Sequence, residues 1–200
     1  MQIKICGLFR REDAEAVNEA CPDYIGFIIG YPKSHRNVSA EKAAELRRLL
    51  RPEIKAVAVF VDLPLQAAAG AARFIGADAV QLHGGEDDGY ITALRRAAGL
   101  HVWKAFSFGS AQDFERARRS AADLILLDGG MGEGRPFDRE LARNAGRPFI
   151  LAGGLTPESI PEAAGLPYLA AVDISSGVET NGVKDADKIR RAVLAAHGGV

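Results

Sequence analysis

The sequence is poor in cysteine, with two in 200 residues, and it contains no CxxC motif. Two cysteines cannot build the disulfide framework of a small secreted protein, and no companion ligands with zinc-site spacing accompany them. No apolar run approaches the roughly 18 residues of a membrane-spanning helix. The start of the chain also lacks the basic and apolar regions of a signal peptide. We therefore expect a reduced, cytoplasmic protein that binds no metal.

Neither sign of charge dominates, because 25 basic and 26 acidic residues leave a net charge of −1. No block of like charges forms a tail for an oppositely charged partner. The balance therefore gives no electrostatic reason to expect nucleic acid or a membrane surface as a partner. The hydrophobic share of 48% suits a globular protein with a substantial core.

Short apolar runs rich in Val, Ile and Phe recur at even spacing, and most are separated by segments with helical patterning. Strand and helix in alternation predict parallel strands with helical crossovers. Eight such units predict a single-domain (β/α)₈ TIM barrel over 1–200, with a doubly wound open sheet as the alternative. The helix after the first strand has the weakest pattern. The expected strands cover 2–6, 24–30, 55–61, 78–83, 101–107, 124–128, 148–154 and 168–176. The clearest expected helices cover 39–50, 63–76, 86–99 and 185–197.

Active sites of such barrels lie at the carboxyl ends of the strands. Side chains of a strand alternate between its two faces, so Lys4 and Cys6 should both point into the barrel. A thiol near a cation can act as a base, although a buried cysteine can equally be a packed small residue. Asp128 ends an apolar run, where burial of a carboxyl group is costly unless the group is paired or has a function. The alternative is that Asp128 only caps a helix or begins a turn. A base and an acid on facing strands would suit a proton-shuttling isomerase.

Two loops after the last strands have the composition of a phosphate site. Gly153 and Gly154 let backbone approach a ligand, and Thr156 can cap the helix that follows. Ser175, Ser176 and Gly177 supply hydroxyl groups and free backbone N–H groups after the last strand. Loops at these two positions recur as the phosphate site of such barrels.

Three further features border the expected site. Arg36 lies in a basic loop and is suited to a carboxylate, unless the loop is only a solvated surface. His83 ends a strand and could be a ligand, a base or a structural residue. The glycine-rich segment 129–137 follows Asp128 and could be a mobile lid.

Several motifs together resemble the phosphoribosylanthranilate isomerase family of tryptophan biosynthesis, over nearly the whole chain and in the family's order. They include "KICGL" (4–8), "YPKSHR" (31–36), "VQLHG" (80–84), "LLD" (126–128), "LAGGL" (151–155) and "VDISSGVE" (172–179). The resemblance implies a cofactor-free barrel that isomerises N-(5-phosphoribosyl)anthranilate by an Amadori rearrangement.

The resemblance also implies roles for particular residues. Cys6 would be the base that removes the proton from sugar C2, and Asp128 the acid that protonates the ring oxygen. Arg36 would hold the anthranilate carboxylate, and the glycine and serine turns the phosphate. We further assign His83 and Asp173 to substrate binding. The alternatives are the related sugar-phosphate isomerase of histidine synthesis and a non-catalytic sensor of phosphate ligands. We expect a monomer or a homodimer.

Overall fold

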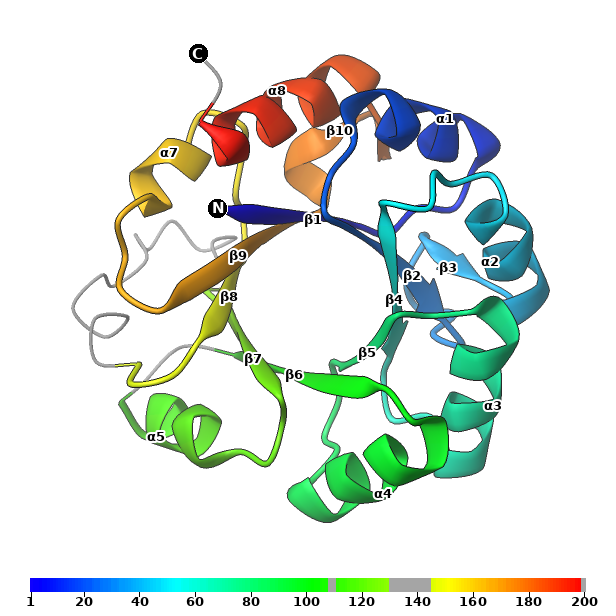
Figure 1. Cartoon of the computed structure of the whole chain (residues 1–200), viewed down its shortest axis with the longest axis vertical. Coiled ribbons are helices and arrows are strands. Elements are labelled where there is room, and N and C mark those ends of the chain that lie inside the picture. The colour runs from blue at the N-terminus through cyan, green and yellow to red at the C-terminus, as the bar shows by residue number, and fades with distance from the viewer. Residues whose placement is uncertain (108–110, 130–144, 199–200) are drawn as a thin grey trace.

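A closed barrel of eight parallel strands lies inside a ring of helices in the computed structural model, which describes residues 1–107, 111–129 and 145–198 (Figure 1). The barrel strands are β1 (Gln2–Cys6), β2 (Tyr24–Ile29), β4 (Lys55–Phe60), β5 (Ala79–Leu82), β6 (His101–Ser107), β7 (Leu124–Asp128), β8 (Phe149–Ala152) and β9 (Leu169–Ile174). Neighbours pair in this order around the barrel, and β1 closes the ring by pairing with both β2 and β9. The closed barrel is confirmed, and the open sheet is excluded.

The outer ring contains the helices α1 (Arg11–Ala20), α2 (Ala40–Arg47), α3 (Leu65–Ile75), α4 (Asp88–Ala98), α5 (Ala111–Arg119), α7 (Ile160–Ala163) and α8 (Ala186–His197). Short elements lie in the loops that follow β2 and β9: β3 (Asn37–Val38), the 3₁₀-helix η2 (Ser176–Val178) and the hairpin of β10 (Glu179–Thr180) and β11 (Val183–Lys184). No helix in the described parts of the chain is long and apolar enough to cross a membrane.

Local signals explain where several helices begin. Ser39 caps α2, because its side chain accepts a hydrogen bond from the backbone of Lys42. The weakly patterned α1 forms as well, and Asp13 stabilises its start by accepting from the backbone N–H groups of Phe9 and Arg10, each at 3.0 Å. Thr156 differs from expectation: its hydroxyl accepts from the backbone of Ser159, so it caps a turn that precedes α7.

The strands separate two apolar layers. Outward side chains such as Ile3 and Ile5 pack against the helices, whereas Cys6, Val59 and Trp103 belong to a smaller cluster inside the barrel. The period-two alternation of β1 produces this division, as expected. The expected lid at 129–137 lies outside the described residues, except for Gly129.

Candidate active site

A cavity of about 340 Å³ lies at the carboxyl ends of the strands. All but one of the residues assigned to the site from the sequence line it: Cys6, Arg36, His83, Asp128, Gly153, Gly154, Asp173, Ser175 and Ser176. Gly177 is the exception. It packs against the backbone carbonyl of Leu155, and a side chain there would collide with that oxygen. Gly177 therefore lets the turns after β8 and β9 approach each other.

Cys6 ends β1 in a buried position, with 7% of its surface exposed. Burial raises the pKa of the Cys6 thiol, and the nearby positive charge of Lys4 opposes that effect only in part. Gly26 on the neighbouring strand provides the space for both groups. A Cβ atom there would lie 2.8 Å from Sγ of Cys6 and 3.2 Å from Nζ of Lys4.

A buried ion pair holds Lys4 beneath the cavity. Its ammonium donates to both carboxylate oxygens of Asp173 on β9, at 3.0 and 2.9 Å. Burial alone would lower the pKa of Lys4, but the charge of Asp173 raises it overall, so the ammonium stays protonated. Lys4 thus places a fixed positive charge beside the thiol of Cys6, as the sequence suggested, and Asp173 is the partner that the sequence did not reveal.

Asp128 and His83 lie close together at the mouth of the barrel. Asp128 ends β7, and its Oδ2 atom lies 3.6 Å from Nε2 of His83, which follows β5. Both side chains are partly exposed, at 32% and 42%. A carboxyl group in this position can reach a ligand in the cavity and exchange a proton with it.

Arg36 does not project freely into the cavity, because Glu179 holds it from the side. The Nε and Nη2 atoms of Arg36 donate to the two carboxylate oxygens of Glu179 at 2.6 and 2.7 Å. Lys184 donates to the same carboxylate at 2.8 Å. Burial would raise the pKa of Glu179, but these hydrogen bonds outweigh it and lower the pKa to about 2. Glu179 ends the "VDISSGVE" motif that carries the resemblance, but neither it nor Lys184 was given a role from the sequence.

The two turns assigned to phosphate differ in the groups that they offer. Gly153 and Gly154 both have positive φ, at 96° and 60°, a conformation that glycine adopts without strain. The Ser175 hydroxyl donates to the backbone carbonyl of Cys6 at 3.0 Å. Its proton is therefore engaged, and any contribution of Ser175 to anion binding comes from the backbone. Ser176 begins η2 and lines the cavity.

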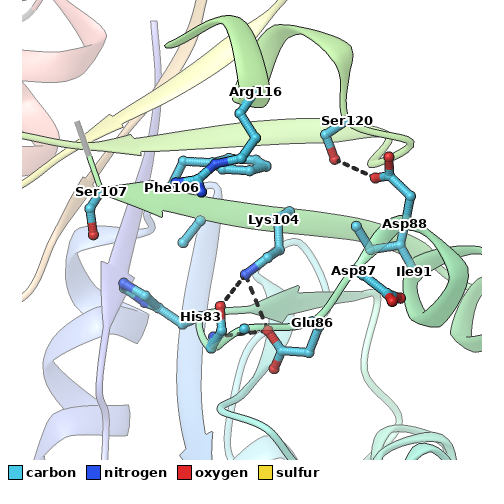
Figure 2. Close-up of a pocket in the computed structure, with 13 residues that line it drawn as sticks. His83, Glu86, Asp87, Asp88, Ile91, Lys104, Phe106, Ser107, Arg116 and Ser120 are labelled. Carbon is cyan, nitrogen blue, oxygen red and sulfur yellow. Dashed lines mark hydrogen bonds and ion pairs between the residues drawn. The ribbon is translucent and has the colours of Figure 1, made fainter. Parts of the chain in front are cut away.

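A second cavity, of about 440 Å³, lies on the other side of His83, between the loop after β5 and the end of β6 (Figure 2). A buried ion pair borders it, in which Nζ of Lys104 lies 3.1 Å from Oε2 of Glu86 and 2.6 Å from the carbonyl of Gly84. The same carboxylate accepts from the backbone N–H groups of Gly84 and Asp62. This cluster, which the sequence did not predict, fixes the turn that directly follows His83.

The described residues contain no group of three or more His, Cys, Asp and Glu side chains that could hold a metal ion. Both cysteines have free thiols. The groups that this site offers for chemistry include the buried thiol of Cys6, the partly exposed carboxyl group of Asp128, the guanidinium group of Arg36 and a glycine-rich turn.

Comparison with known proteins identifies the family. Residues 3–195 match the family model described as N-(5'-phosphoribosyl)anthranilate (PRA) isomerase. The N-(5'-phosphoribosyl)anthranilate isomerase of Lacticaseibacillus casei strain BL23 is 42% identical over 194 residues, which are 97% of this chain and 94% of that protein.

Solved structures agree with this match. A crystal structure of phosphoribosyl anthranilate isomerase in complex with reduced 1-(o-carboxyphenylamino)-1-deoxyribulose 5-phosphate superposes with a TM-score of 0.85 at 36% identity. Monomers generated from the dimeric Thermotoga maritima enzyme superpose with a TM-score of 0.85 at 37% identity. Each comparison covers 99% of both chains. The chain belongs to the N-(5'-phosphoribosyl)anthranilate isomerase family.

Proposed function

We propose that this chain converts N-(5-phosphoribosyl)anthranilate into 1-(2-carboxyphenylamino)-1-deoxyribulose 5-phosphate, an Amadori rearrangement in L-tryptophan biosynthesis. One observation carries the proposal: the thiol of Cys6 and the carboxyl group of Asp128 line a single cavity together with Arg36 and a glycine turn. Membership of the isomerase family supports the same reaction. The substrate has a carboxylate at one end and a phosphate at the other, so it needs both cationic and backbone partners.

The proposed reaction begins with acid catalysis by Asp128. Its proton passes to the ring oxygen of the ribose as the bond between that oxygen and C1 breaks, which leaves a protonated imine. The Cys6 thiolate then removes the proton from C2, and the C–H electron pair forms the C1–C2 double bond of an enolamine. The enolamine tautomerises to the aminoketone product.

Lys4 supports the base in this scheme. Because burial raises the pKa of the Cys6 thiol, the thiolate is a minor form at neutral pH. The neighbouring ammonium, held by Asp173, stabilises that thiolate when it forms.

Substrate binding is assigned to groups around the acid and the base. The Nε and Nη2 atoms of Arg36 donate to Glu179. We therefore propose that Nη1 donates to the anthranilate carboxylate. Gly153, Gly154 and the turn of Ser175, Ser176 and Gly177 are proposed to hold the phosphate through backbone N–H groups. His83 and Asp173 complete the proposed substrate contacts.

The test is an assay of the purified protein with N-(5-phosphoribosyl)anthranilate, in which loss of the substrate's fluorescence reports turnover. The imidazole-containing substrate of the histidine-pathway isomerase serves as the comparison. We expect turnover of the anthranilate substrate and a much smaller rate with the other. No turnover of the anthranilate substrate, or a preference for the imidazole substrate, would contradict the proposal.

The assembly is proposed to be a monomer or a homodimer, and static light scattering of the purified protein distinguishes the two. The solved Thermotoga maritima relative derives from a dimeric enzyme. A cytoplasmic location stays a prediction.

A further inference from the structure

Gln81 is a polar residue in an apolar layer of the barrel. It lies on β5, where its backbone is in register with Val59 of β4 and Trp103 of β6. Both neighbours belong to the apolar cluster inside the barrel. Gln81 is 1% exposed, and it lines the same cavity as Cys6 and Asp128. Its amide therefore borders the cavity from the barrel interior, two residues before His83 in the chain.

The buried amide oxygen of Gln81, its Oε1 atom, has no hydrogen-bond donor among the described residues. Other buried polar groups nearby are paired: Lys4 with Asp173, and Lys104 with Glu86. Leaving one acceptor buried without a donor costs stability, whereas an apolar side chain of similar shape would avoid that cost.

We infer that Gln81 is a substrate-binding residue at the floor of the active-site cavity, where its amide oxygen accepts a hydrogen bond from a sugar hydroxyl group. This inference rests on the proposed function and refines it. At neutral pH the phosphate and carboxylate ends of the substrate offer acceptors only, and the cations and backbone turns at the mouth suit them. The donors lie between those ends, in the sugar hydroxyl groups and the amino N–H group, and we assign a hydroxyl group to the buried oxygen of Gln81.

The decisive variant is Gln81→Met, which keeps the length of the side chain and removes the amide. The free protein should lose no stability, because the variant removes an unpaired buried polar group, so its midpoint in urea should stay equal or increase. Its kcat/KM for N-(5-phosphoribosyl)anthranilate should fall about tenfold, the loss expected for one hydrogen bond to the substrate. Gln66→Met, at an exposed position of α3, is the matched control and should change neither quantity.

Binding of two small ligands separates the hydroxyl contact from the rest of the site. Ribose 5-phosphate offers hydroxyl groups and a phosphate, whereas inorganic phosphate offers the phosphate alone. In direct binding measurements Gln81→Met should weaken ribose 5-phosphate about tenfold and leave inorganic phosphate unchanged. The inference is overturned if both ligands weaken equally, if neither changes, if the wild type binds ribose 5-phosphate no better than phosphate, or if the variant is less stable than the wild type.

These measurements do not depend on turnover. A wild-type protein that fails to isomerise the anthranilate substrate would contradict the proposed function, while the comparison of ribose 5-phosphate with phosphate would still decide the role of Gln81.

Discussion

Replacing Glu179 with glutamine should remove the anion that holds two cations beside the mouth of the barrel. The Glu179 carboxylate accepts two hydrogen bonds from Arg36 and one from Lys184, at 2.6 to 2.8 Å. Its side chain is 6% exposed, that of Lys184 is fully buried, and that of Arg36 is 18% exposed. Glutamine keeps the shape of the side chain but has no charge, so the two cations lose their shared counter-ion.

The pKa of Glu179 sets the size of the effect. It falls from the ordinary 4.5 to about 2 in the folded protein, a difference of about 2.5 pH units. At about 1.4 kcal/mol per pH unit, this corresponds to roughly 3 kcal/mol of stability. Water around the partly exposed Arg36 screens part of this interaction, so we expect the carboxylate of Glu179 to contribute about 2 kcal/mol to the free energy of unfolding. Because the folded pKa is the lower one, this stability is present above the unfolded pKa and is lost as the pH falls through about 2.

Urea unfolding of the wild type and Glu179→Gln at pH 7 and pH 3 tests this reasoning. The variant should be less stable by about 2 kcal/mol at pH 7, and the difference should shrink at pH 3. Glu15→Gln is the matched control, because Glu15 pairs with Arg11 on the exposed surface of α1, where such pairs contribute little. A difference that is absent at pH 7, or equally large at pH 3, would refute the argument.

Three further predictions concern the groups around the cavity. Alkylation of Cys6 by iodoacetamide in a Cys21→Ser background should be slow at pH 7 and should accelerate only at alkaline pH, because burial raises the thiol pKa; half-maximal reactivity below the free-thiol value of about 8.5 would contradict this. Lys4→Met should lower the free energy of unfolding by about 3–5 kcal/mol, since it leaves the carboxylate of Asp173 buried without a cation. In urea unfolding, an added Asp173→Leu should recover part of that loss. Arg36→Lys should raise KM about tenfold or more with a smaller change in kcat, because an ammonium cannot replace the oriented guanidinium edge; an unchanged KM in steady-state kinetics would argue against the carboxylate contact.

The barrel could be predicted because its strands are buried on both faces. Such strands appear in the sequence as continuous apolar runs, and every expected run contains an observed strand. Strands of two residues, such as β3 and the hairpin after η2, carry no periodicity and were not anticipated. Alpha-helix α1 formed despite its polar sequence, since the carboxylate of Asp13 supplies a cap that a count of apolar residues does not detect.

Which residues line the cavity could also be predicted from the sequence. The ion pairs that fix their side chains could not. Strand ends and period-two alternation were enough to place Cys6 and Asp128 at one rim. Arg36 and Glu179, in contrast, are separated by 143 residues, and only the closed fold brings them together. The unpaired amide of Gln81 is equally invisible in the sequence, because a lack of partners becomes evident only when all neighbours are placed.

The most direct test of the proposed acid–base mechanism is the turnover number of Cys6→Ala and Asp128→Ala with saturating N-(5-phosphoribosyl)anthranilate, followed by fluorescence. We predict that each variant folds, as judged by circular dichroism, and loses kcat by about a hundredfold to ten-thousandfold, the range expected for removal of a general acid or base. A folded variant of either kind that keeps kcat within about threefold of the wild type would contradict this account.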